Sequence, residues 1–176
     1  VTGDALLFAG GANFAPPVFD NDKVWHDRVF VLPKPDGEWI EAGTLPRPLA
    51  YGMSVTYEGE VICIGGDDAD QAYTDVFALS WDGSKLTTRT LPALPEPVAY
   101  GGAALIGSTV YVAGGQTGKT IQPATNYLYA MDLAADEPAW ERLPDMPDEA
   151  GVRAHNFAVA PPDGKADMLS GFGGRH

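Results

Sequence analysis

Short apolar runs separated by turn residues form the dominant pattern along the chain. Runs rich in Val, Ile, Phe and Tyr alternate with clusters of Gly, Pro and Asp, which is typical of β-strands joined by tight turns. Some runs, such as 61–64, are apolar at every position, as expected for a strand that is covered on both faces. No stretch holds the 3.6-residue periodicity of a helix, and proline recurs too often for one. The pattern therefore predicts an all-β protein.

Three sequence markers recur along the chain. Apolar runs end in Gly-Gly at 10–11, 65–66, 114–115 and 173–174; Leu-Pro or Met-Pro occurs at 45–46, 94–95 and 146–147; and Ala-Tyr-Gly occurs at 50–52 and 99–101. Between the second and third copies, the distances from Gly65 to Gly114, Pro46 to Pro95 and Tyr51 to Tyr100 are each 49 positions. A period near 50 is typical of kelch repeats, each of which forms one blade of a β-propeller.

Strands can be assigned within each repeat. We expect them at 5–9, 27–32 and 38–42, at 52–57, 61–64, 75–81 and 86–91, at 102–106, 109–113, 126–132 and 140–143, and at 155–160 and 168–172. The predicted blades span 1–46, 47–95, 96–147 and 148–176, and the first and last are incomplete. The whole chain, 1–176, is thus interpreted as a single partial kelch-type β-propeller, an arc of three to four blades from a six-bladed ring. The remainder of a longer protein or a second chain would close that ring.

The charge balance narrows the choice of partners. The 176 residues include 24 acidic and 11 basic ones, for a net charge of −13. Such a surface repels phosphate backbones and anionic lipids, so we expect neither a nucleic-acid nor a membrane partner. An anionic small molecule would need basic groups focused in one cleft. Cys63 is the single cysteine, which excludes an intrachain disulfide and a Cys-based zinc site, and we interpret it as a buried apolar residue.

Two connections in the first half carry candidate binding residues. The longest connection in the chain follows Gly-Gly at 10–11 and contains Asn13; the alternative is an ordinary surface loop. The second connection holds Arg47 between two prolines, which suits bidentate recognition of a carboxylate. The alternative for Arg47 is a structural salt bridge to a neighbouring carboxylate. Tyr51 recurs as Tyr100, so an architectural role is its alternative.

The equivalent connection of the last unit, at 148–156, carries Arg153 and His155. Arg153 would supply a second contact to an anion. His155 is a weak acid/base candidate because imidazole titrates near neutrality, and its alternative is a hydrogen-bonded packing role. No cofactor-binding or metal-binding motif is present in the sequence.

The segments 7–14, 23–27 and 47–55 resemble the last part of the N-acetylneuraminate mutarotases, or epimerases, which are bacterial kelch propellers. The second half, with Trp140, Leu143 and the 148–156 connection, resembles the first part of those enzymes, in the order of their cyclically permuted branch. The resemblance implies cofactor-free interconversion of the anomers of sialic acid, a small anionic sugar, by acid/base-assisted ring opening. It also implies a periplasmic location, and Asn13, Arg47, Tyr51 and Arg153 as substrate-binding residues.

One segment of that family has no counterpart in the chain. The catalytic Glu of the family lies in an Asn-Gly-Glu…Lys-Pro-Gly-Leu-Arg segment, whereas the comparable connection 115–119 contains no Glu. In the permuted order, we expect that blade after His176. No catalytic residue is therefore assigned in this chain. The alternative function is a non-catalytic kelch propeller that binds a protein or a carbohydrate, since a fold alone does not fix a function.

Overall fold

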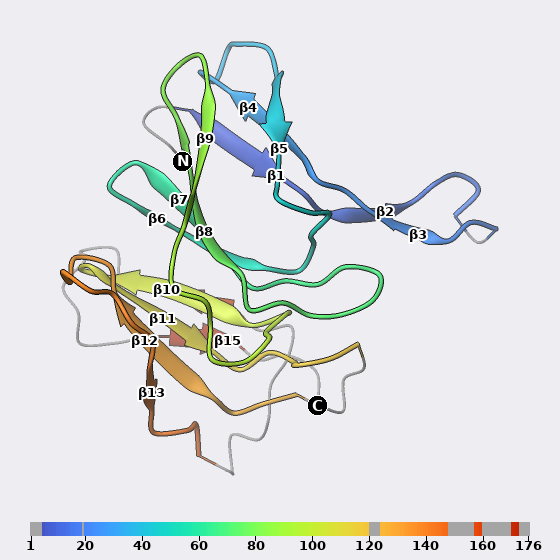
Figure 1. Ribbon diagram of the computed structural model, residues 1–176. Coiled ribbons are helices and arrows are strands. Elements are labelled where there is room, and N and C mark those ends of the chain that lie inside the picture. The colour runs from blue at the N-terminus through green and yellow to red at the C-terminus, as the bar shows by residue number, and fades with distance from the viewer. Residues whose placement is uncertain (1–4, 19, 120–123, 148–156, 160–169, 173–176) are drawn as a thin grey trace.

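The regular structure of the chain is β throughout the part that can be described. The computed structural model describes residues 5–18, 20–119, 124–147, 157–159 and 170–172. Their strands form antiparallel sheets that follow one another along the chain (Figure 1). Within these ranges no helix is long and apolar enough to cross a membrane.

Two complete four-stranded sheets form the middle of the molecule. Their strand orders are β6-β7-β8-β9 and β10-β11-β12-β13, so each strand pairs with the next one in sequence. The bounds are β6 Met53–Tyr57, β7 Glu60–Ile64, β8 Val76–Trp81 and β9 Leu86–Thr90, then β10 Gly102–Ile106, β11 Thr109–Ala113, β12 Leu128–Asp132 and β13 Glu141–Leu143. All eight strands were predicted, and every end lies within two residues of its predicted position.

The outer sheets are smaller, and the first one differs from the prediction. It contains β1 Leu6–Ala9, β4 Arg28–Leu32 and β5 Ile40–Thr44. Between β1 and β4, where the sequence predicted an irregular loop, the chain forms a separate hairpin of β2 Ala12–Phe14 and β3 Lys23–Trp25. Strands of three residues are too short to show a two-residue alternation, which is why sequence reasoning missed them. At the other end, β14 Phe157–Val159 pairs with β15 Ser170–Phe172.

The core consists of two apolar layers on opposite faces of the β6–β9 sheet. Successive side chains of a strand point to opposite faces, so Ile62 and Ile64 of β7 pack toward the β10–β13 sheet. Their neighbours Val61 and Cys63 pack toward the first sheet instead, beside Phe77 of β8. Burial on both faces explains the continuous apolar run that the sequence shows here.

Two Gly-Gly corners of the described chain, at 10–11 and 65–66, are hydrogen-bonded to the segment that enters the following sheet. The Gly66 amide donates to the Val98 carbonyl at 2.8 Å. Gly65 has a φ of 60°, and a Cβ added to it would lie 2.1 Å from the same carbonyl oxygen, so only glycine fits. We call this contact the inter-blade latch; it recurs at Gly10 and Gly11 with Leu49.

Candidate functional site

One end of the sheets gathers the long connections of the chain. The β2–β3 hairpin, the β7–β8 connection and the described part of the β11–β12 connection all project to the right in Figure 1. The segments that lead into β6 and β10 reach the same end because the strands alternate in direction, and β6 lies beside β10. Connections of this kind carry binding residues on a rigid scaffold, so this end is the candidate site.

Tyr51 and Tyr100 stand at equivalent repeat positions, two residues before the first residues of β6 and β10. Both have left-handed backbones, with φ values of 57° and 58°, a conformation that is uncommon for a bulky side chain. Their rings stack with centroids 4.3 Å apart and an interplanar angle of 21°. The Tyr100 amide also donates to the Tyr51 carbonyl at 2.8 Å. The recurring tyrosine thus has an architectural role, because it joins one sheet to the next.

Asp67, the residue after the second Gly-Gly, is a buried polar group between these elements. It is only 3% exposed, and its Oδ1 accepts a hydrogen bond from Trp25 Nε1 at 3.0 Å. Burial raises the pKa of Asp67; the bond from Trp25, the charges of Lys119 and Lys23 and a hydrogen bond with Tyr100 offset only part of that effect. Burial, followed by the charge of Asp67, in turn raises the pKa of Tyr100. Asp67 therefore connects the β2–β3 hairpin to the segment that leads into β10.

Two ammonium groups lie over the aromatic rings at this end. Lys23 Nζ is 4.2 Å from the ring centroid of Tyr51 and 4.9 Å from that of Trp25. Lys119 Nζ is 4.7 Å from the centroid of Trp25 and donates to the backbone carbonyl of Asp68. These distances are within the range of cation–π attraction. We call the group the lysine–aromatic cluster; its members are Lys23, Trp25, Tyr51, Asp67, Tyr100 and Lys119.

Arg47 contacts protein groups that are not members of this cluster. Its Nε lies 3.1 Å from Oδ2 of Asp75, and its guanidinium lies 4.2 Å from the ring centroid of Tyr73. A hydrogen bond with Tyr73, and then the charge of Asp75, raise the pKa of Arg47 and outweigh the effect of burial. The structure thus shows the salt bridge that was the alternative to ligand binding. A bound carboxylate would have to compete with Asp75 for this guanidinium.

The other predicted site residues are distributed as follows. Asn13 lies on β2, and its Oδ1 is 2.9 Å from Nε2 of His26 across an exposed part of the hairpin. Arg153 and His155 lie outside the described residues. Asn13 is thus on the same hairpin as Lys23 and Trp25 of the lysine–aromatic cluster, and Tyr51 is itself a member of that cluster. Within the described ranges, no three His, Cys, Asp or Glu side chains are grouped as they would be around a metal ion.

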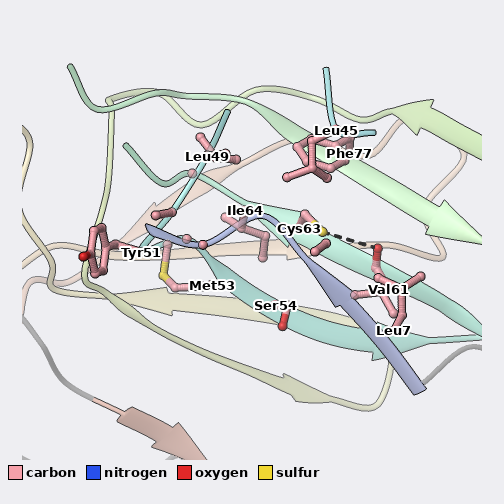
Figure 2. A pocket seen from close by; sticks show the side chains of 15 residues that line it. Leu7, Leu45, Leu49, Tyr51, Met53, Ser54, Val61, Cys63, Ile64 and Phe77 are labelled. Atoms are coloured by element: carbon pink, nitrogen blue, oxygen red, sulfur yellow. Dashed lines mark hydrogen bonds between the residues drawn. The ribbon is translucent and has the colours of Figure 1, made fainter. Parts of the chain in front are cut away.

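A cavity lies between β1 and the β6–β7 pair, and Tyr51 of the lysine–aromatic cluster lines part of it. It has a volume of about 200 Å³, and aliphatic side chains such as Leu7, Leu49 and Val61 line most of it. Figure 2 shows Tyr51 at one end of this cavity and Leu7 and Val61 at the other. By its Gly-Gly ending, β1 matches the second strand of a blade, so the hollow occupies the place of an innermost strand. We therefore do not assign ligand binding to it.

Sequence reasoning missed most of the lysine–aromatic cluster. Asp67, Tyr100, Trp25 and the two lysines come from connections of three successive units, and nothing local in the sequence shows that they meet. One signal was available. Only five lysines occur in the chain, and Lys23 and Lys119 both lie in a connection that follows a Gly-Gly marker.

The comparisons with known proteins agree with this architecture. The family model for N-acetylneuraminate epimerase matches residues 1–88, and the model for the kelch motif matches residues 97–147. The solved structure of YjhT superposes with a TM-score of 0.74 and covers 92% of this chain at 13% identity. The predicted fold class, a partial kelch-type β-propeller, is therefore confirmed.

Curated relatives align with the first half of the chain. The N-acetylneuraminate epimerase of Brucella suis is 42% identical over 98 residues, or 48% of this chain. The enzyme of Haemophilus influenzae strain PittEE is 39% identical over 93 residues, and that of Yersinia enterocolitica is 38% identical over 98. The matched segment spans 24% of the length of each of these relatives, and the chain covers 54% of the YjhT structure. The family model matches half of the chain, residues 1–88 of 176, and this chain therefore belongs to the N-acetylneuraminate epimerase family.

Proposed function

We propose that the protein carrying this chain interconverts the anomers of N-acetylneuraminate. The observation that carries the proposal is the family match over residues 1–88. That segment contains Lys23, Trp25, Tyr51 and Asp67, the larger part of the lysine–aromatic cluster. The function thus rests on a stretch of sequence that builds the candidate site as well as the fold.

The reaction requires only modest acid and base assistance. A base removes the proton of the anomeric hydroxyl while an acid protonates the ring oxygen, so the ring opens to the ketone, rotates about one bond and closes again. No redox step or group transfer occurs, and the chain would contribute binding and orientation. Asn13, Tyr51 and Arg153 remain predicted substrate contacts within this proposal, and no catalytic residue is assigned.

The test is the rate of anomer exchange. N-Acetylneuraminate dissolved in one anomeric form re-equilibrates spontaneously, and NMR resolves the two anomers. We expect the full-length protein to increase the first-order rate in proportion to its concentration, and the heat-inactivated protein to leave it unchanged. A neutral sugar such as glucose serves as the control for specificity.

The alternative function gives a different result. A non-catalytic kelch propeller that binds carbohydrate would broaden or shift the sugar signals without changing the exchange rate. That outcome would contradict the mutarotase proposal. It is the relevant alternative because the Asn-Gly-Glu segment of the family has no counterpart within this chain.

A further inference from the structure

Most cations in the described part of the chain are already paired. Each of the four arginines lies against a carboxylate: Arg28 with Glu41, Arg47 with Asp75, Arg89 with Glu60 and Arg142 with Asp145. Lys34 pairs with Asp36 at 3.8 Å. Within the described residues, neither Lys23 nor Lys119 has a carboxylate oxygen within 4.0 Å. Their charges reach nearby carboxyl groups, and both offset part of the rise that burial causes in the pKa of Asp67. Hydrogen bonds, that of Tyr73 first, and the charge of Lys119 together outweigh burial and lower the pKa of Asp68. In a chain with a net charge of −13, the two ammonium groups therefore make this end less repulsive to an anion than the rest of the surface.

The surroundings of Lys23 suit one kind of anion in particular. Its ammonium lies near two aromatic rings, 4.2 Å from the Tyr51 centroid and 4.9 Å from the Trp25 centroid. The Trp25 indole is held in turn by its hydrogen bond to the buried Asp67. The rings thus hold the Lys23 ammonium in place from their faces, and Tyr51 in addition stacks on Tyr100. An ammonium positioned in this way can donate its remaining N–H groups to a carboxylate, the anionic group of an acidic sugar.

We propose that Lys23 binds the carboxylate of the acidic sugar, that Trp25 and Tyr51 position its ammonium, and that Lys119 supplies a second positive charge. This inference rests on the proposed function and names the residues of that site. In N-acetylneuraminate the carboxylate is attached to the anomeric carbon. A contact to the carboxylate therefore fixes the reacting carbon and leaves the ring oxygen and the anomeric hydroxyl accessible.

A lysine suits this reaction better than a paired arginine does. The two anomers exchange the axial and equatorial positions of the carboxylate and the hydroxyl, so one site must hold the carboxylate in both. An ammonium on a flexible four-carbon stem can follow that change, whereas a planar guanidinium imposes one geometry. The pairing of Arg47 with Asp75 is consistent with this division of roles.

The experiment compares a charged and an uncharged ligand on matched variants of the full-length protein. The ligands are N-acetylneuraminate and its methyl ester, titrated into the unaltered protein, Lys23→Gln and Lys119→Gln. Lys85→Gln is the control, because Lys85 is an exposed lysine in the turn between β8 and β9, at the opposite end of the sheet. Melting curves show that each variant is folded.

We expect Lys23→Gln to weaken binding of the acid about tenfold to a hundredfold, the size of a lost charge-assisted bond. Binding of the methyl ester should change little, so the preference for the acid disappears. Lys119→Gln should reduce that preference partially, and Lys85→Gln should leave it intact. If Lys23→Gln keeps the full preference for the acid, the inference is overturned while the proposed function stands. If the unaltered protein binds neither ligand, the proposed function and this inference both fail.

Discussion

The inter-blade latch predicts a large difference between two glycine substitutions that look alike in sequence. Gly65 and Gly107 both have a φ of 60°. An added Cβ at Gly107 meets nothing within 4 Å, whereas at Gly65 it would lie 2.1 Å from the Val98 carbonyl oxygen. Gly65→Ala and Gly107→Ala therefore carry the same backbone penalty, about 1–2 kcal/mol for a left-handed residue with a side chain. Only Gly65→Ala adds a steric conflict between two sheets.

The size of that conflict follows from the contact distances. A carbon and a carbonyl oxygen approach to about 3.3 Å at closest, so the two segments must separate by roughly 1 Å. The hydrogen bond of 2.8 Å from the Gly66 amide to the Val98 carbonyl would then be lost. Gly66 and Val98 are both buried, and leaving a buried polar group without a partner costs about 1–3 kcal/mol. We expect Gly65→Ala to be less stable than Gly107→Ala by about 2–4 kcal/mol.

Urea denaturation followed by tryptophan fluorescence measures both variants under the same conditions. The midpoint of Gly65→Ala should fall well below that of Gly107→Ala, with a similar dependence on urea concentration, since the surface exposed on unfolding is unchanged. Equal midpoints for the two variants would refute the reasoning. The close approach at the Gly-Gly corner would then contribute nothing to holding adjacent sheets together.

Three further predictions concern single side chains. Arg47→Ala should lower the free energy of unfolding by less than about 1 kcal/mol, because its partner Asp75 is partly exposed. Titration of this variant with N-acetylneuraminate and its methyl ester should show an unchanged preference for the acid. Loss of that preference would identify Arg47 as a ligand residue. Burial raises the folded-state pKa of Asp67 above its ordinary 3.8. The protonated carboxyl therefore makes its full contribution to the free energy of unfolding below about pH 3.8, and this contribution declines as the pH rises through the folded-state pKa. In urea titrations from about pH 4 toward neutrality, the free energy of unfolding of Asp67→Asn should therefore rise relative to that of the unaltered protein. An opposite trend would contradict the burial of this carboxyl. Burial raises the pKa of Cys63 to about 12, so iodoacetamide at mildly alkaline pH should label this thiol only after unfolding, and rapid labelling of the folded protein by mass spectrometry would be inconsistent with the structure.

The strands were predictable because their signals are local. Alternation, turn residues and the Gly-Gly markers act over a few positions, and they placed β6 to β13 within two residues of their observed ends. The β2–β3 hairpin was missed because its strands are too short for such a signal. Fold class and repeat length thus follow from the sequence, while the shape of the longest connection does not.

The site was less predictable because it is made of contacts between units. Trp25 and Asp67 are 42 positions apart and meet only when the first two sheets pack together. Arg47 has the right chemistry for a carboxylate, but the fold brings Asp75 close enough to pair with it, and sequence alone does not show that a ligand would have to compete with this neighbour. The small number of basic residues in the sequence indicates which side chains are candidates for binding an anion. The packing of adjacent blades decides which of those side chains are available to a ligand.

The inter-blade latch also has a consequence for how such sequences diverge. Its donor and acceptor are main-chain groups, the Gly66 amide and the Val98 carbonyl, so the contact depends on a missing side chain rather than on a particular one. Mutation can then replace most of the surrounding residues while the registry between blades is inherited unchanged. This fits the 13% identity with which YjhT and this chain retain a common architecture.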